Sequence, residues 1–183
     1  DEYGERTFID GLTGLPNGSY FENILVTAYG DAVKESRSFA VLRVKIDAFD
    51  EYVEAYGKDS ADRCVRAVAQ VIRAASGAGA GKVYRIDGGD FACILSDTAE
   101  PEAFERAEAL RARVLALELP HAKSAAASFV TVSQGLAGLR ADTEENAFEF
   151  ERSAEHALFR AAQQGGNQIC SAEKNRHHRA GKA

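Results

Sequence analysis

Hydrophobic residues along this chain recur with two spacings, one typical of α-helices and one typical of β-strands. Where they return every three or four residues, they predict helices over residues 19–33, 49–56, 61–75, 101–117 and 144–163. In residues 38–46 and 128–136 they alternate with other residues, which predicts strands. Every second residue from Ala40 to Ile46 lies on one side of the first strand, and we expect only that side to face a core. A last short strand is expected over residues 168–170.

Residues 83–95 predict a β-hairpin. Two hydrophobic runs, 83–86 and 91–95, flank the polar link Asp87-Gly88-Gly89-Asp90. Gly and Asp tolerate the positive φ angles of tight hairpin turns. The glycines would let a ligand approach the backbone, and the two carboxylates could hold a divalent cation or take a proton. An ordinary surface turn is the alternative interpretation of this stretch taken alone.

Composition limits the possible classes of protein. The chain has 183 residues and a net charge of −6, which argues against nucleic acid as a partner. No apolar run approaches the length of a membrane span, so we expect no membrane contact. Three dispersed cysteines, at positions 64, 93 and 170, suit buried thiols in a reducing compartment better than a disulfide framework or a zinc site. The sequence contains no Met, and we expect it to be part of a longer or processed protein.

The order of the elements predicts one α/β domain, an α+β sandwich built on a central, mostly antiparallel five-stranded sheet flanked by helices. We expect residues 1–9 to be a connecting segment from an upstream domain and residues 10–171 to be the folded domain. Residues 172–183 are polar and basic, which predicts a disordered tail.

Several stretches, taken together from about residue 10 to residue 169, resemble a GGDEF domain. The resemblance rests on the stretches Asp10 to Asn17 (Asp-Gly-Leu-Thr-Gly-Leu-Pro-Asn), Ile46-Asp47-Ala48-Phe49 with Tyr56-Gly57 and Asp62, the hairpin Tyr84 to Leu95, Val130 to Ser133 with Gly135, and Ala154 to Asn167. It implies the palm-like fold of nucleotidyl cyclases and, in active members, the condensation of two GTP molecules into cyclic di-GMP in bacteria.

The resemblance also implies two metal-ligand positions, and neither holds a ligand here. The first is the leading Asp of the family's Asp-x-Asp at the strand end, a position that Lys45 occupies here. The second is the third residue of the signature, a position that Gly89 occupies. A Lys ammonium repels Mg²⁺, and Gly has no side-chain ligand atom. The signature itself reads Asp87-Gly88-Gly89-Asp90-Phe91 and differs from Gly-Gly-Asp/Glu-Glu-Phe at three of its five places. In a register shifted by one residue, Asp90 would serve as a metal ligand beside Asp47.

The implied nucleotide contacts are also changed. The positions for phosphate-binding and guanine-binding side chains hold Asp50, Val53, Ala162 and Gly166. Asp62, a guanine contact, and Arg85, just before the signature, remain as the family has them, so Asp62, Arg85 and Asp47 are the nucleotide-binding candidates. The family's Arg-x-x-Asp site for its own product would fall at residues 78–81, which are Ala-Gly-Ala-Gly. Arg111 lies near a further arginine contact of the family, but a lone helical Arg is more often solvated.

We therefore predict a degenerate GGDEF domain with no intact catalytic residue, which acts in the cytoplasm as a regulatory or scaffold module in cyclic di-GMP-related signalling. Its expected partners are other domains of the same protein, a protein partner or a second copy, with guanine nucleotide bound weakly if at all. No cofactor is expected. The alternatives are a GTP sensor that does not react, or an active diguanylate cyclase that needs Mg²⁺. Lys45 either replaces the metal by pairing with Asp47, Asp50, Asp87 and Asp90, or lies on a solvated charged rim.

Overall fold

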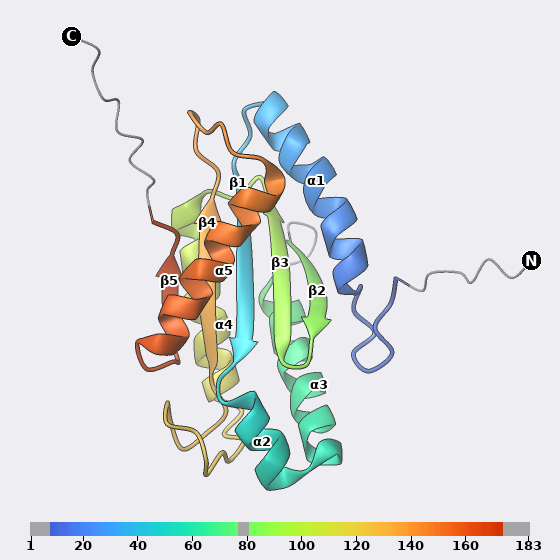
Figure 1. The fold of residues 1–183 in the computed structure, drawn as a ribbon, viewed down its shortest axis with the longest axis vertical. Helices are drawn as coiled ribbons and strands as arrows, with labels where there is room; N and C mark the ends of the chain where they lie inside the picture. The colour runs from blue at the N-terminus through green and yellow to red at the C-terminus, as the bar shows by residue number, and fades with distance from the viewer. Residues whose placement is uncertain (1–7, 77–80, 174–183) are drawn as a thin grey trace, which may run out of the picture.

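The computed structural model describes residues 8–76 and 81–173, which form five helices and five strands in two helical layers around one sheet (Figure 1). In chain order the elements are α1 Gly18–Lys34, β1 Phe39–Ile46, α2 Phe49–Tyr56, α3 Lys58–Ala75, β2 Gly81–Asp87, β3 Asp90–Ser96, α4 Glu100–Leu115, β4 Val132–Gly138, α5 Ala147–Gln163 and β5 Ile169–Ser171. The sheet order is β2-β3-β1-β4-β5. Three of its pairings are antiparallel, and only β4 and β5 are parallel. The predicted fold class is confirmed.

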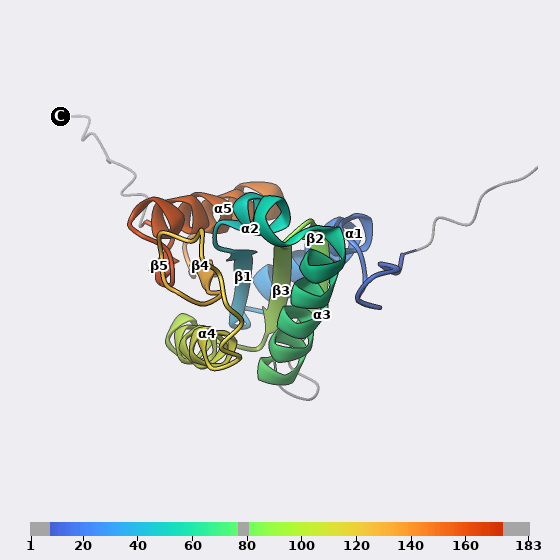
Figure 2. The same cartoon turned by 90° about the horizontal axis from the view of Figure 1, so that it is seen from below.

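Helices cover both faces of the sheet, so the expectation that β1 has only one face in a core is wrong. Figure 2 shows α1 and α5 on one side and α3 and α4 on the other. Ala40, Leu42, Val44 and Ile46 pack in the cluster beneath α3 and α4. Phe39 and Val41, on the opposite face, pack in a second cluster with α1 and α5. Burial of both faces makes β1 the centre of the fold, with β3 and β4 as its neighbours.

The strand predicted over residues 128–136 begins later, at Val132, and continues to Gly138. Residues 128–131 pair instead with the loop that follows α4, because the Val130 N–H donates to the Leu119 carbonyl and Phe129 bridges to Pro120. Leu136, Ala137 and Gly138 complete the antiparallel pairing with β1. The irregular segment brings Thr131 to the end of β1, where its carbonyl accepts the Asp47 N–H at 2.9 Å.

Local sequence fixes how α5 begins and where it lies. Asn146 caps its first turn, and the Glu149 side chain accepts the Asn146 N–H to complete a capping box. At Gly135 of β4 the helix approaches so closely that a Cβ atom would lie 2.0 Å from the Ala154 carbonyl oxygen. Only Gly at this position permits the contact between α5 and β4.

Two of the three cysteines, Cys64 and Cys93, are buried free thiols, as predicted, whereas Cys170 is half-buried on the edge strand β5. Within residues 8–76 and 81–173 no helix is both long and apolar enough to cross a membrane. The predicted connecting segment and tail lie largely in residues 1–7 and 174–183, outside the described part of the chain.

Candidate functional site

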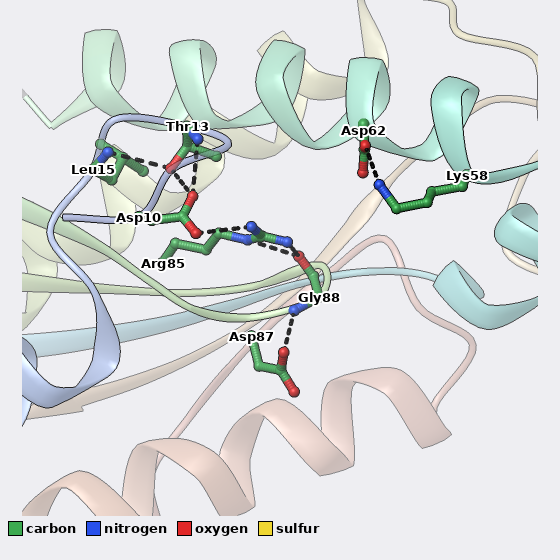
Figure 3. A network of polar contacts seen from close by, with 8 residues as sticks. All are labelled: Asp10, Thr13, Leu15, Lys58, Asp62, Arg85, Asp87 and Gly88. Atoms are coloured by element: carbon green, nitrogen blue, oxygen red, sulfur yellow. Dashed lines mark hydrogen bonds and ion pairs between the residues drawn. The ribbon is translucent and has the colours of Figure 1, made fainter. Parts of the chain in front are cut away.

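The loop of residues 10–17, here called the opening loop, is fastened to the hairpin by Arg85 (Figure 3). The Arg85 guanidinium donates to Asp10 Oδ1 at 2.9 Å, and two of its nitrogens donate to the Gly88 carbonyl at 3.0 and 3.2 Å. The other oxygen of Asp10 accepts the Thr13 hydroxyl at 2.6 Å and the Thr13 N–H at 2.8 Å. Arg85, predicted as a nucleotide-binding candidate, is thus already occupied by bonds within the chain.

The environment of Asp10 favours its charged form. Partial burial acts to raise the pKa of this carboxyl, but the two Thr13 hydrogen bonds and the Arg85 charge outweigh burial and hold the pKa below its ordinary value. Because both side chains of the Asp10–Arg85 pair are less than one-fifth exposed, solvent screens it weakly. The pair therefore stabilises the join between the opening loop and the signature turn.

The signature forms a two-residue turn. Asp87 pairs with Asp90 across the hairpin, and Gly88 between them has φ +44°. The Gly88 N–H donates to the Asp87 carboxylate at 2.9 Å, which closes the turn on itself. Gly89 is buried against α2, and a Cβ there would lie 3.0 Å from the Phe49 ring and 3.1 Å from Ile46 Cβ. At this position, where the resemblance implies a metal ligand, hydrophobic neighbours would crowd any side chain.

Asp47, the first residue after β1, is only 8% exposed, and both of its carboxylate oxygens are used inside the protein. Oδ2 accepts the Thr131 hydroxyl at 2.6 Å and the Asn167 N–H at 2.8 Å. Oδ1 accepts the Ser133 hydroxyl at 2.6 Å. Asp47, predicted as a nucleotide-binding candidate, is therefore a buried residue that links the end of β1 to β4 and to the α5–β5 loop.

The backbone of the α5–β5 loop closes over this junction. Gly166, where the resemblance implies a phosphate-binding Arg, has φ +73°, and a Cβ at this position would lie 3.0 Å from the Asp47 carboxylate. Sequence reasoning missed the partners of Asp47. Their signal was present in Thr131 and Ser133, two hydroxyls on the same side of a hydrophobic stretch, because buried hydroxyls need a hydrogen-bonding partner.

Lys45 does not form the ion-pair cluster that was one of the two expectations for it. Its side chain is exposed and lies within 4 Å of no carboxylate in the part of the chain that the structure describes. Its cross-strand partner is Asp90. Burial raises the pKa of Asp90, and the charges of Lys45 and Arg43 oppose this only in part. The two charges influence each other without direct contact.

A charged cluster that the sequence did not indicate is centred on Arg43, two residues before Lys45 on β1. Arg43 is buried and bonds to Glu151 and, at 3.1 Å, to Glu155, both on α5. Burial raises the pKa of Glu151, although the Arg43 charge acts against that shift. These ion pairs join β1 to α5 on the face of the sheet that also carries Lys45.

The two remaining residues, Asp62 and Arg111, make no hydrogen bond or ion pair with Asp47 in the described part of the chain. Asp62, on α3, pairs with Lys58 at 2.8 Å and keeps an exposed surface (Figure 3). The Lys58 hydrogen bond lowers the pKa of Asp62, and the charge of Arg85 contributes to the same shift. Arg111 is not simply solvated, because it donates to Asn167 Oδ1 at 3.1 Å and pairs with Glu108. The stretch where the product site is predicted to be absent, residues 78–81, lies outside the described residues except for Gly81.

His121 supports the turn that follows β1. It is fully buried, its Nε2 lies 2.8 Å from the Ala48 carbonyl oxygen, and its ring meets the Tyr52 ring edge-on. Ala48 itself has φ +50° and no side-chain cap for α2. The loop after α4 thus holds the backbone of the turn between β1 and α2.

The donor set does not fit the magnesium ion that the family resemblance implies. Mg²⁺ requires carboxylate or other oxygen ligands in near-octahedral geometry. In the described residues no group of three or more His, Cys, Asp or Glu side chains is arranged to hold a metal. Asp47 is saturated by three hydrogen-bond donors, and Gly89 offers no ligand atom.

Solved structures identify the fold. The GGDEF domain of DgcB from Caulobacter crescentus, in complex with c-di-GMP, matches with a TM-score of 0.83 and 24% identity, over 95% of this chain and 98% of that one. The FimX GGDEF domain from Pseudomonas aeruginosa matches with a TM-score of 0.78 and 23% identity, over 89% and 98% of the two chains. The class of protein is therefore an α/β domain of the GGDEF type.

Sequence comparison gives the family. A model of the family described as "Diguanylate cyclase, GGDEF domain" matches residues 7–168, and the chain belongs to this family of cyclic di-GMP signalling. The bifunctional diguanylate cyclase/cyclic di-GMP phosphodiesterase MucR of Pseudomonas aeruginosa is 30% identical over 166 residues, which is 91% of this chain. The probable diguanylate cyclase DgcC of Escherichia coli is 25% identical over 158 residues, or 86% of this chain. The chain spans only 24% and 41% of the lengths of these two relatives.

Proposed function

We propose that this GGDEF domain does not cyclise GTP and acts instead in the cytoplasm as a regulatory or scaffold module in cyclic di-GMP-related signalling. The observation that carries the proposal is the internal saturation of Asp47. Its two oxygens hold three hydrogen bonds from Thr131, Ser133 and Asn167, and Gly166 closes over them. The Asp47 carboxylate at the end of β1 is therefore not free to hold the metal on which the family's reaction depends.

A second line of support comes from which family-like residues are kept and which are changed. The kept Asp10, Thr13 and Arg85 bond to one another or to the backbone of the hairpin, so each stabilises the fold. The changed positions Lys45 and Gly89 are those where the resemblance implies contact with metal. This division is expected of a domain that keeps its shape for binding partners after losing the need for turnover.

Partners of such a module are other domains of the same protein, a separate protein or a second copy of this chain. Weak guanine-nucleotide binding through Asp62 is the other outcome that the test below distinguishes. It has less support, because Arg85 is engaged with Asp10 and the phosphate-facing positions carry Ala162 and Gly166.

The test is calorimetric titration of the purified chain with GTP and Mg²⁺, with a cyclic di-GMP product assay on the same sample. A known diguanylate cyclase serves as the positive control. We expect neither heat nor product. Heat that disappears in Asp62→Ala, without product, would replace the proposal by a nucleotide sensor. Product well above background would overturn it and would favour the shifted register in which Asp90 acts as a ligand.

A further inference from the structure

The outward side of α5 carries two large aromatic side chains that nothing in the described chain covers. Phe148 and Phe159 are 53% and 62% exposed, the highest values among the exposed large hydrophobic residues of the described ranges. They are three helical turns apart, about 16 Å along the axis, and therefore lie on the same side of the helix. In Figure 1 this helix crosses the outside of the sheet, beside α1.

Two residues of opposite charge lie between the aromatic residues on the same side. Arg152 is exposed and makes no hydrogen bond or ion pair with residues 8–76 or 81–173. Glu155 reaches Arg43 through Oε1 and keeps 48% of its side chain exposed. The outward stripe of α5 therefore reads, in order, Phe148, Arg152, Glu155, Phe159, and it is here called the α5 stripe.

The α5 stripe is complementary to itself when it is reversed. Phe148 and Phe159 are equally distant from the midpoint between residues 153 and 154, and so are Arg152 and Glu155. In two antiparallel α5 helices related by a two-fold axis at that midpoint, each Phe148 meets the partner's Phe159. Each Arg152 then meets the partner's Glu155. Such matching is what an isologous two-fold interface requires, because every contact occurs twice.

We propose that the α5 stripe is a self-association surface, and that its occupant is a second copy of this chain bound antiparallel along α5. The uncovered parts of four Phe rings amount to about 450 Å² if a Phe side chain offers about 200 Å². A stable interface buries about 1,200–2,000 Å² in total, so the rings supply roughly a quarter to a third of it. The association is therefore weak and reversible. It specifies one of the partners named for the proposed function, and it does not depend on whether the nucleotide site is inert.

Sedimentation equilibrium of the full chain, from micromolar to near-millimolar concentration, tests the proposal. We expect a monomer–dimer equilibrium that is weakened about tenfold or more by Phe159→Ser, and likewise by R152E, which sets two carboxylates against each other. The control is Phe104→Ser, which removes an exposed Phe from α4 and leaves the association unchanged. Thermal unfolding of each variant verifies that it is folded. The proposal is overturned if the chain stays monomeric at all concentrations, or if neither α5 substitution weakens the dimer.

The antiparallel direction has its own test in the same protein. Phe148→Cys and Phe159→Cys are made separately in a chain that also carries Cys170→Ser, since Cys170 is the half-buried native thiol. Under mild oxidation we expect a disulfide-linked dimer only when the two variants are mixed. A linked dimer of Phe148→Cys with itself would mean a parallel contact and would overturn the proposed arrangement.

Discussion

Replacing Asp47 by Ala separates a structural role for this carboxylate from a ligand-binding role. The replacement removes the acceptor of three hydrogen bonds, from Thr131, Ser133 and Asn167. A hydrogen bond to a charged group contributes about 1.5–3 kcal/mol. We take the low end, because the two hydroxyls can turn to other acceptors whereas the Asn167 N–H cannot. The expected loss in the free energy of unfolding is about 4 kcal/mol, a large part of the roughly 5–15 kcal/mol that holds a domain together.

The assay is urea unfolding of the wild type and the variant in EDTA, followed by far-UV circular dichroism. The free energy of unfolding of Asp47→Asn should lie between those of the wild type and Asp47→Ala. The Asn amide oxygen can accept two of the three hydrogen bonds, but its nitrogen must find an acceptor of its own. Asp50→Ala is the control, since this neighbouring carboxylate is exposed and its loss should change stability by less than about 0.5 kcal/mol. A loss below about 1 kcal/mol for Asp47→Ala would refute the reasoning and return Asp47 to the list of available ligands.

Three further outcomes follow from single positions. Gly135→Ala should destabilise the domain by about 3 kcal/mol or more, because the new Cβ would lie 2.0 Å from the Ala154 carbonyl oxygen. Gly30→Ala is the control, because a Cβ at Gly30 meets open space and should not destabilise the domain. Thermal melting measures both variants. Tyr84→Phe should stabilise the domain by about 1 kcal/mol in urea unfolding, because it removes a buried hydroxyl that has no hydrogen-bond partner among the described residues. The pKa of Asp10 is lowered, so its contribution to the free energy of unfolding is present above about pH 4 and is lost as the pH falls through its folded-state pKa. Asp10→Asn should therefore lose about 1 kcal/mol of stability at pH 7 and a smaller amount at pH 3. Equal losses at the two pH values would contradict this role of Asp10.

The fold was predictable from the sequence because its signals are local. Every helix has a hydrophobic stripe, and the Gly and Asp residues of the signature mark the turn between β2 and β3. The second buried face of β1 was not predictable in the same way. Arg43 and Lys45 make that face look polar, and only the ion pairs of Arg43 with α5 show how a charge can be buried there.

The candidate site was less predictable, because its decisive contacts are remote in sequence. Asp47 meets its hydrogen-bond partners 84, 86 and 120 residues further along the chain. The buried hydroxyls of Thr131 and Ser133 indicate that an acceptor is needed, but no pattern of residue types identifies Asp47 as that acceptor. The family resemblance placed Asp47 and Arg85 near a nucleotide, whereas their observed bonds are to the protein itself. The motif match thus named candidate residues but could not give the hydrogen bonds of their side chains.

The steric closure at Gly89 makes a further prediction about restoring a metal site. Lys45→Asp combined with Gly89→Asp would supply both carboxylates that the family resemblance implies, yet we expect no Mg²⁺ binding by calorimetry. The Gly89 Cβ position lies 3.0 Å from the Phe49 ring and 3.1 Å from Ile46 Cβ, so a side chain there requires these two neighbours to move by a few tenths of an ångström. Overpacking of this kind destabilises a domain by about 1–3 kcal/mol.

The variant Lys45→Asp alone is the matched control for that experiment. It keeps Gly89 and alters an exposed side chain, so it should lose only the small stability that setting a second carboxylate opposite Asp90 costs, about 0.2–1 kcal/mol. Adding Phe49→Ala to the double variant should recover part of the lost stability, because it removes the ring that Gly89 faces. If the double variant instead bound Mg²⁺ and melted like the wild type, the hairpin would be free to move away from α2. Loss of the metal site would then be a matter of side-chain identity alone, rather than of a closed backbone.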